Sequence, residues 1–434
     1  MKPKILLVTF FSFYFVSCSS LFNTYSSKPF KNKNQTFHSG FIIADSTGKI
    51  VKAENEKNLF TPASVLKLYH LPFFLNLKTD SKYLTTGFSV KEKNDSLQIS
   101  IFSNGDPLLN SHELDSIASI IKRDSIPVSS VTIYTSNYDS SEFWGNGWMW
   151  DDEPADYQSY LNGFPVDENT VTISYYRQNA TDNFSFDGIK LPVNFSNGNL
   201  QIKRIRTQNK IEISRPDSQI NLGKLKKIFS FRNPDSVISG FISEIFQTQK
   251  VSFQQSDSSI KSAFNYSIVH PFDSLMTRIL TYSSNFCAEQ TIRYSAVKNG
   301  TLGNIKNGLL IEKQSNPKSQ NRIVDGSGLS RYNLVSPESI LKMISEDSKI
   351  NKKWFAKYAN KGTLRDRLEL NNQSITIYAK SGTMTGIQNL AGFVFRENKF
   401  IGYAFLFTNN TIENKESRNL FEKEFLDYAV EILN

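Results

Sequence analysis

The sequence predicts a mixed α/β (α+β) protein in which helices flank an antiparallel sheet and a large, mostly β region interrupts that sheet. Two observations lead to this prediction. Strand-like alternation occurs near both ends of the chain, with long helical patterns in the last third and a helix at the end. Between roughly residues 78 and 263 the pattern is again strand-like, over a stretch much longer than an ordinary connection. A chain of 434 residues is also longer than one average domain, so two or more compact units are expected.

The N-terminal part of the predicted sheet is a hairpin followed by a helix. Strand patterns at residues 40–45 and 49–51 flank a turn in which Gly48 can adopt a positive φ. A mostly apolar run at residues 64–75 predicts a helix. Pro62 suits the start of that helix, because the N–H that proline lacks is not needed there.

The middle region is expected to be mainly β. Short alternating segments lie at residues 97–101, 131–134, 170–173 and 251–253, without a clear repeat. One helix is predicted at residues 114–121. The sequence therefore predicts an inserted region of one or two lobes.

The C-terminal third combines long helices with several strands. Helical patterns cover residues 271–299 and 336–347, and a final amphipathic helix starts near residue 413. Strands are predicted at residues 374–380, 390–395 and 400–408. We therefore expect residues 37–77 and 264–434 to form one split domain, with residues 78–263 inserted into it.

The N-terminus is typical of an export signal. Basic residues precede an apolar run at residues 5–16, which is too short to span a bilayer. Small residues then lead to Cys18, as at a bacterial lipoprotein cleavage site, so residues 1–18 are interpreted as a signal peptide and Cys18 as the lipidated residue. Ordinary signal cleavage nearby is the alternative and implies the same compartment. Residues 19–36, rich in Ser, Asn and Lys, read as a flexible tether.

Composition argues against several classes of function. The net charge of +9 is spread through the chain, and no zinc-finger spacing or arginine-rich arm supports nucleic-acid binding. Two cysteines, Cys18 and Cys287, are too few for a cysteine-rich metal site, and the four histidines show no H-x-x-x-H spacing. No metal or other cofactor is therefore expected. Cys287 lies in an apolar helical stretch, where a cysteine is most often a small buried hydrophobe.

The first candidate motif is S-x-x-K, formed by Ser64 and Lys67. Their spacing puts both side chains on one face of a helix. At the start of that helix, the backbone N–H of Ser64 is free to donate to a substrate oxygen. A serine needs a base to become a good nucleophile, and Lys67 can be that base if burial and a second cation keep it neutral. The alternative is an ordinary helix start with a surface serine and lysine.

The second candidate motif is S-x-N, formed by Ser283 and Asn285. It interrupts an apolar helical pattern at residues 272–294, so its polar side chains either face solvent or lie inside a cleft. In the cleft, Ser283 would relay a proton to the leaving group, while Asn285 would hold Lys67 and the substrate amide.

The third candidate motif is K-[ST]-G, formed by Lys380, Ser381 and Gly382 at the end of a predicted strand. A strand edge can pair with an extended peptide, and Gly382 would let the peptide approach closely. Lys380 would attract a free carboxylate, which the hydroxyls of Ser381 and Thr383 would hydrogen-bond. A glycine-containing hairpin turn is the alternative.

Two further roles connect the third motif with the first. Lys380 is the natural second cation that would keep Lys67 neutral. The backbone N–H of Thr383, with that of Ser64, could form an oxyanion hole.

Each triplet alone occurs by chance in many chains, but the three in this order match the penicillin-recognising serine acyltransferases. Other stretches make the resemblance more specific. They are G-D-P at residues 105–107, G-W-M-W-D-D at 147–152, S-S-N-F-C-A-E-Q at 283–290 and D-G-S-G-L-S-R at 325–331. The chain resembles the low-molecular-mass, class C penicillin-binding proteins of the D-alanyl-D-alanine carboxypeptidase/endopeptidase type, peptidase family S13. The likeness runs from about residue 40 to the end.

The resemblance implies a split transpeptidase/β-lactamase-like domain, exported to the periplasm, that cleaves D-alanyl-D-alanine bonds of peptidoglycan stem peptides. It implies that Ser64 is acylated, also by β-lactam antibiotics, and that Lys67 is the base. It further implies that an acidic residue of the Trp-rich segment helps to select the cationic side chain of the stem peptide. Asp152 best matches that residue, with Asp151 adjacent. Ser284 departs from the family pattern, which has Asp at this place.

The D-G-S-G-L-S-R loop at residues 325–331 has two interpretations. It could contribute to the site, or it could be a structural Gly-rich turn beside the site, which is the interpretation we favour.

Two rival functions share some of these features. A serine β-lactamase or esterase would use the same motifs, but the long insertion and the loop at residues 325–331 argue against it. A non-catalytic wall-binding lipoprotein with a dead site is the other rival, and the intact motifs argue against that. A Ser-His-Asp hydrolase is excluded because His70, six positions after Ser64, lies off its helical face.

Overall fold

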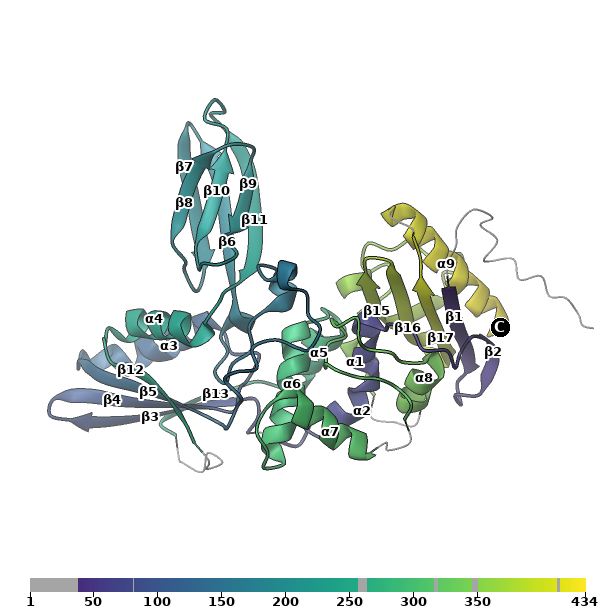
Figure 1. Cartoon of the computed structure of the whole chain (residues 1–434), viewed down its shortest axis with the longest axis horizontal. Coiled ribbons are helices and arrows are strands. Elements are labelled where there is room, and N and C mark those ends of the chain that lie inside the picture. The colour runs from purple at the N-terminus through teal and green to yellow at the C-terminus, as the bar shows by residue number, and fades with distance from the viewer. Residues whose placement is uncertain (1–37, 81, 257–263, 316–318, 346–349, 412–413) are drawn as a thin grey trace, which may run out of the picture. The chain divides into compact units, whose positions relative to one another are not determined.

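The computed structural model describes residues 38–434 apart from residues 81, 257–263, 316–318, 346–349 and 412–413 (Figure 1). The predicted signal peptide, Cys18 and the tether lie outside the described residues. All described residues belong to one compact unit. None of the helices in this part of the chain is long and apolar enough to cross a membrane.

A six-stranded antiparallel sheet joins the two ends of the described chain, in the order β14-β15-β16-β17-β1-β2. Its strands are β1 (His38–Asp45), β2 (Ile50–Glu54), β14 (Ala356–Lys357), β15 (Ile375–Met384), β16 (Ile387–Arg396) and β17 (Lys399–Asn409). The first strand pairs along its whole length with the last, from His38 opposite Asn409 to Asp45 opposite Gly402. The N-terminal hairpin thus completes a sheet whose other strands come from the C-terminal third.

Helices cover both faces of this sheet (Figure 1). Phe41 of β1 contacts Phe425 of α9 (Lys415–Ile432), with ring centroids 5.9 Å apart. The next residue, Ile42, belongs to the core that contains Leu341 of α8 (Pro337–Ser345). Because successive strand residues point to opposite faces, α9 and α8 lie on opposite faces of the sheet.

The remaining helices of this part share the core on the α8 face. They are η2 (Ala63–Val65), α1 (Leu66–Tyr69), α2 (Leu71–Leu75), α5 (Phe272–Leu280), α6 (Asn285–Lys298) and α7 (Ile305–Ser315). Leu66, Leu275 and Ile292 are all buried in one cluster with Ile42. This packing brings segments far apart in the sequence, η2 and α6, to the same end of the sheet.

Two details of the helical predictions were wrong. The helix predicted over residues 271–299 is two helices, α5 and α6, because Ser283 adopts a φ of +63° and Ser284 caps the second helix. Helix α7 was not predicted, since Gly308 weakens its pattern. A Cβ on Gly308 would lie 2.2 Å from the Ile292 carbonyl oxygen, so the glycine permits close packing of α7 on α6.

The inserted region contains one larger and two smaller sheets, and the expected strands at residues 97–101, 131–134, 170–173 and 251–253 are confirmed. The five-stranded sheet has the order β12-β5-β4-β3-β13, with parallel pairing of β12 with β5 and of β5 with β4. Its strands are β3 (Thr85–Lys93), β4 (Ser96–Ser103), β5 (Val128–Thr135), β12 (Val251–Gln255) and β13 (Tyr266–Val269). The smaller sheets, β8-β10-β9 and β11-β6-β7, consist of β6 (Thr170–Gln178), β7 (Thr181–Asp187), β8 (Val193–Asn197), β9 (Gln201–Arg204), β10 (Ile211–Arg215) and β11 (Leu222–Ser230).

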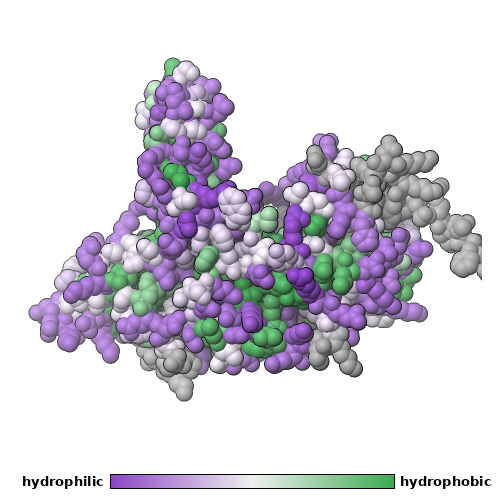
Figure 2. All heavy atoms as spheres, viewed as in Figure 1, coloured by the Kyte–Doolittle hydropathy of each residue, from purple (hydrophilic) through white to green (hydrophobic). Residues whose placement is uncertain are grey.

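A second hydrophobic core holds the inserted region together. The predicted helix at residues 114–121 is confirmed as part of α3 (Ser111–Ile121). A second helix, α4 (Pro234–Phe246), was not predicted because Gly240 weakens its pattern, and burial of Ile238 and Ile242 in this core compensates. The face of the two smaller sheets that Figure 2 shows is mostly hydrophilic. Lys226 and Lys227 of β11 are exposed.

Candidate active site

The S-x-x-K motif lies in a tight helical turn between the sheet and the central helices. Ser64 belongs to η2, and Lys67 lies in the following α1, where its side chain is completely buried. Two glycines allow other segments to approach this turn. A Cβ on Gly328 would lie 1.9 Å from the Ala63 carbonyl oxygen, and a Cβ on Gly382 would lie 2.7 Å from that of Pro62. A glycine is therefore needed at position 382 because a side chain there would collide with the turn that contains Ser64.

Lys67 connects the first two motifs. Its Nζ lies 3.0 Å from Ser64 Oγ and 2.7 Å from Asn285 Oδ1. A third contact, of 2.6 Å, reaches the carbonyl oxygen of Ser327. The amide and carbonyl oxygens can only accept hydrogen bonds, so they take two N–H groups of a neutral amine and leave its lone pair for the serine hydroxyl.

Burial favours this neutral state. Burial lowers the pKa of Lys67 to about 7, although the nearby carboxylates of Glu289 and Asp325 act in the opposite direction. A lysine that is partly neutral near pH 7 is suited to remove a proton from a hydroxyl group.

The S-x-N motif occupies the break between α5 and α6. Ser284 accepts a hydrogen bond from the N–H of Cys287 at 3.0 Å, which caps α6. Ser283 Oγ accepts from Lys380 Nζ at 2.8 Å. Asn285 donates from Nδ2 to the Tyr157 carbonyl oxygen at 2.9 Å, which orients its Oδ1 toward Lys67. The break in the helix is thus what turns all three side chains in different directions.

The third motif lies inside a strand rather than at the end of one, because β15 continues to Met384. Lys380 is buried, and its Nζ donates to Ser283 Oγ and to the Ser381 carbonyl oxygen, both at 2.8 Å. Burial, and then the charge of Lys67, lower the pKa of Lys380 well below its usual value. The charge of Lys67 thus lowers the pKa of Lys380, whereas burial is what lowers the pKa of Lys67.

The edge of β15 next to the motif is open within the described part of the chain. The neighbouring β14 pairs only with Tyr378 and Ala379. On that edge the N–H of Tyr358 donates to the Ile377 carbonyl oxygen. Since the backbone groups of alternate residues point to the same side of a strand, those of Thr383 also point to this open edge.

The loop at residues 325–331 is a hydrogen-bonded turn, and it contributes to the site as well as lying beside it, because the Ser327 carbonyl contacts Lys67. The Asp325 carboxylate accepts hydrogen bonds from the N–H groups of Gly328 and Ser330 at 2.9 and 2.6 Å. Trp148 of the Trp-rich segment donates its indole N–H to the same carboxylate at 3.0 Å. These bonds hold the turn in the shape that directs the Ser327 carbonyl toward Lys67.

Glu289 is a residue of this site that sequence analysis did not single out. Its buried carboxylate accepts from the N–H groups of Gly326 and Ser327, each at 2.8 Å. Burial, and then the charge of Asp325, raise the pKa of Glu289 to about 8. The signal was present in the sequence, since Glu289 belongs to the S-S-N-F-C-A-E-Q stretch, but its partners are almost 40 positions away.

Glu168 is the second such residue. Its Oε2 accepts a hydrogen bond from Ser284 Oγ at 2.6 Å, and its Oε1 forms an ion pair with Arg278. Asp167, Glu168 and Asn169 all have φ values between +52° and +55°, a conformation that side-chain-bearing residues rarely adopt. Strain of this kind persists only where the surroundings enforce it and is concentrated at functional sites. No sequence pattern predicted this turn.

Asp152 is connected to the S-x-N motif through Tyr157. Its Oδ1 accepts from the Tyr157 hydroxyl at 2.8 Å, and the Tyr157 carbonyl in turn accepts from Asn285. Asp151 is exposed, and its carbonyl oxygen accepts from Arg206 instead. Of the two neighbouring acids, Asp152 is therefore the one linked to the site.

Other candidate residues lie elsewhere. His70 is buried with its Nδ1 2.8 Å from Glu312 and makes no contact with Ser64, so a Ser-His-Asp arrangement is absent from the described residues. Burial raises the pKa of the Cys287 thiol well above its usual value, so this cysteine is unreactive. No group of three or more His, Cys, Asp and Glu residues in the described part could hold a metal ion.

The contacts among Ser64, Lys67 and Asn285 are those expected of a serine acyltransferase site. The model of the D-Ala-D-Ala carboxypeptidase 3 (S13) family matches residues 31–424, and the chain belongs to this family. The class predicted from the three motifs, peptidase family S13, is confirmed.

Two curated proteins and two solved structures illustrate the relationship. The D-alanyl-D-alanine carboxypeptidase DacB of Haemophilus influenzae is 26% identical over 165 residues, 34% of this chain and 34% of that protein. The penicillin-sensitive carboxypeptidase A of Dictyostelium discoideum is 25% identical over 398 residues, 78% of this chain and 75% of that protein. The first alignment thus spans about a third of its relative, and the second about three quarters.

The solved structures confirm the predicted fold class. Penicillin binding protein 4 of Haemophilus influenzae superposes with a TM-score of 0.73 at 20% identity, covering 91% of this chain and 96% of that one. A predatory peptidoglycan endopeptidase of Bdellovibrio bacteriovorus superposes with a TM-score of 0.53 at 12% identity, covering 91% and 92% of the two chains.

Proposed function

We propose that this chain is a serine D,D-peptidase that cleaves the D-alanyl-D-alanine bond of peptidoglycan stem peptides, as a carboxypeptidase, an endopeptidase or both. The observation that supports this most is the contact between the Lys67 amine and Ser64 Oγ at 3.0 Å, with the two other partners of that amine both acceptors. β-Lactams acylate the same serine. Relatives support this proposal, because a complex with a β-lactam is known for the Haemophilus protein and a penicillin G acylated form for the Bdellovibrio endopeptidase.

The first step is attack on the carbonyl carbon of the penultimate D-alanine. Neutral Lys67 takes the proton of Ser64 as the Oγ–C bond forms. The substrate backbone lies along the open edge of β15, and the N–H groups of Ser64 and Thr383 stabilise the oxyanion.

Breakdown of the tetrahedral intermediate releases the terminal D-alanine. The proton that Lys67 took from Ser64 passes to the leaving amine as the C–N bond breaks, with Ser283 as the relay, so Lys67 is neutral again. Ser283 is hydrogen-bonded to Lys380, and Asn285 holds Lys67 and the substrate amide. Water then hydrolyses the ester on Ser64, with Lys67 as the base. The chemistry needs no metal or other cofactor.

Substrate contacts come from the third motif and the Trp-rich segment. Lys380, with the hydroxyls of Ser381 and Thr383, binds the terminal carboxylate. Gly382 lets strand and substrate lie close to the Ser64 turn. Asp152 is the acid that faces the cationic side chain of the stem peptide.

The location follows from the substrate and from the N-terminus. The protein acts on the cell wall in the periplasm. Residues 1–18 are a lipoprotein signal, Cys18 carries the lipid that anchors the chain to a bacterial envelope membrane, and residues 19–36 are the tether. Residues 37–77 and 264–434 form the split catalytic domain around the insertion at residues 78–263. The strand β13 (Tyr266–Val269), just after the insertion, pairs with β3.

The decisive experiment follows the intact mass of the protein lacking residues 1–18 after mixing with benzylpenicillin. We expect a stable one-to-one adduct that is absent from Ser64→Ala, while both proteins melt at the same temperature. An adduct that disappears within seconds while the drug is consumed would instead identify a β-lactamase. No adduct and no loss of drug would point to a wall-binding protein with an idle site, and labelling of Ser64→Ala would exclude Ser64 as the nucleophile.

A further inference from the structure

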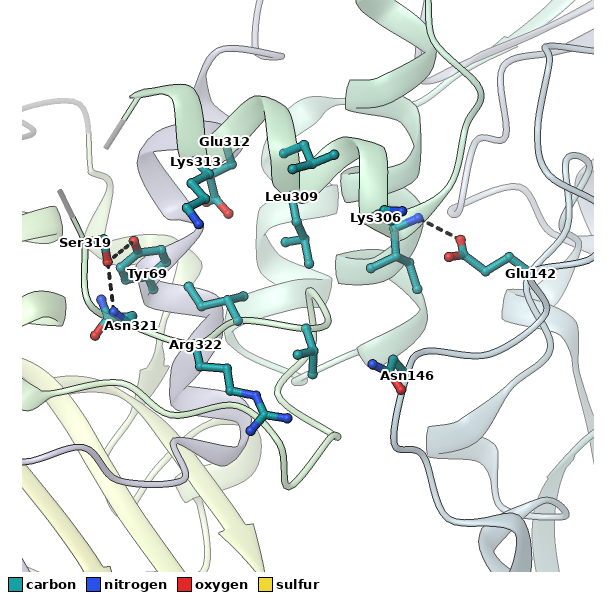
Figure 3. A pocket seen from close by; sticks show the side chains of 14 residues that line it. Tyr69, Glu142, Asn146, Lys306, Leu309, Glu312, Lys313, Ser319, Asn321 and Arg322 are labelled. Atoms are coloured by element: carbon teal, nitrogen blue, oxygen red, sulfur yellow. Dashed lines mark hydrogen bonds between the residues drawn. The ribbon is translucent and has the colours of Figure 1, made fainter. Parts of the chain in front are cut away.

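A cavity of about 600 Å³ lies between α7 and the segment at residues 319–324 (Figure 3). None of the residues with a proposed catalytic role lines it. Its volume falls within the range of small-molecule sites. This cavity is called the α7 pocket below.

The rim of the α7 pocket is cationic. Lys306, Lys313 and Arg322 line it, and all three are exposed. Within the described residues, none of the three has an ion-pair partner, and Arg322 only lies over the ring of Tyr332, 5.4 Å from its centroid. Three free cations around one cavity raise the local concentration of anions.

The two acids of the pocket are occupied inside the protein. Glu312 is buried against His70, with its carboxylate 2.8 Å from Nδ1. Glu142 accepts a hydrogen bond from the N–H of Ile305 at 2.7 Å. The charges of the pocket that remain without a partner in the described part of the chain are therefore positive.

The inner wall of the pocket is apolar. In Figure 3, Leu309 points into the cavity between Lys306 and Lys313, with Arg322 and Asn146 on the other side. Ile323 adds to the apolar wall. A ligand that fits must therefore combine a negative charge with small apolar groups and a few hydrogen-bonding groups.

The pocket wall is also the outer side of the catalytic turn. Tyr69 of the wall follows Lys67 by two positions, and Val324 directly precedes Asp325. His70, which binds the pocket residue Glu312, also contacts the Asp325 carbonyl oxygen through Nε2 at 3.3 Å. A ligand in the pocket would rest on the same turn that holds Lys67.

We propose that the α7 pocket is an accessory binding site for an anionic peptide that ends in a free carboxylate and carries small apolar side chains. A stem peptide from which the terminal D-alanine has been removed has this chemistry: a new carboxylate, methyl side chains and amide groups. This identification of the ligand rests on the proposed function. The site holds a trimmed stem peptide while the catalytic site acts on another.

The test measures binding of diacetyl-L-lysyl-D-alanine, a singly charged peptide with a free carboxylate, by isothermal titration calorimetry. The protein is first acylated with benzylpenicillin, which closes the catalytic cleft. We expect the acylated protein to bind one equivalent of the peptide, and the C-terminal amide of the same peptide at least fivefold more weakly. Lys306→Glu/Lys313→Glu should weaken peptide binding at least fivefold, because two attractive contacts become repulsive.

The matched control is Lys91→Glu/Lys93→Glu, which makes the same charge change on exposed lysines of β3. It should bind the peptide as the unmodified protein does. Equal weakening in both variants would show that the effect comes from the net charge of the protein, and would overturn the proposed site. Peptide binding that vanishes after acylation would place the only binding in the catalytic cleft and would also overturn it.

The two proposals fail separately. If benzylpenicillin forms no adduct, the proposed function is wrong, and the comparison of the two lysine variants is made on the unreacted protein. A difference between those variants then still supports an anion site, and its absence still refutes one.

Discussion

The buried lysines of the candidate active site and a buried ion pair of the inserted region treat buried charge in opposite ways. In the inserted region, buried charges are matched directly: Glu153 pairs with Arg204 at 2.9 Å. In the catalytic core, Lys67 and Lys380 are completely buried, and neither has an ion-pair partner within the described residues. Paired buried charges are common structural features, whereas a buried lysine held neutral costs stability and is kept where chemistry needs it. The contrast separates the charges that hold the fold from those that perform the reaction.

The largest effect is expected from replacing Lys67 with an uncharged side chain of similar length. Lys67→Met should slow acylation by benzylpenicillin by about 10²- to 10⁴-fold, because the general base is lost. The melting temperature should stay the same or rise, since a buried amine is removed. Rates come from the intact-mass time course and stability from thermal unfolding, with the exposed Lys57→Met as control. An unchanged acylation rate would exclude Lys67 as the base.

For the buried ion pair of the inserted region we expect a loss of stability without a loss of activity. Glu153→Gln leaves the buried guanidinium of Arg204 without its carboxylate and should lower the free energy of unfolding by about 3 kcal/mol. Acylation of the folded protein should not change. Urea unfolding measures the loss, and Glu244→Gln, which breaks the exposed pair with Lys190, should cost less than about 1 kcal/mol. Equal losses in both variants would remove the distinction between the cores.

The pH dependence tests the neutral state of Lys67. With a pKa of about 7, the neutral fraction rises about tenfold between pH 6 and pH 8, so the second-order acylation rate should rise by a similar factor. Intact-mass measurements on samples quenched at set times, at fixed ionic strength, give the dependence of the acylation rate on pH. A rate that is flat over this range would show that Lys67 does not titrate there.

The same group predicts how stability varies with pH. The folded pKa of Lys67 is lowered from the ordinary 10.5 to about 7, so the unfolded state binds more protons between these values. The contribution of Lys67 to stability therefore increases as the pH rises from about 7 toward 10.5. Lys67→Met should remove this part of the slope.

The smallest effect is expected at the strained turn that contains Glu168. Glu168→Gln keeps a hydrogen-bond acceptor for Ser284 but loses the charge that faces Arg278, so acylation should slow by about three- to tenfold. The exposed Glu92→Gln is the control and should leave the rate unchanged. If the melting temperature falls and the rate does not, Glu168 stabilises the fold without positioning the S-x-N motif.

Local patterns predicted much of this protein because their physical causes are local. The strands at residues 390–395 and 400–408 and the terminal helix follow from side-chain periodicity. Helices α4 and α7 escaped prediction because glycines at 240 and 308 weaken the local preference, which tertiary packing then overrides. The break between α5 and α6 was also not predicted, because the helical spacing of apolar residues continues across it.

The sequence by itself determined the family, the order of the three motifs and the residue types that the chemistry requires, because these depend on spacing within single elements. Only the tertiary structure decided which partners those residues have. The carbonyl of Ser327 and the carboxylates of Glu289 and Glu168 come from segments far from Ser64 in the chain, and they meet only when the sheet closes. Burial decided the rest, because the pKa of Lys67 depends on the removal of water by the whole core, which no short motif encodes.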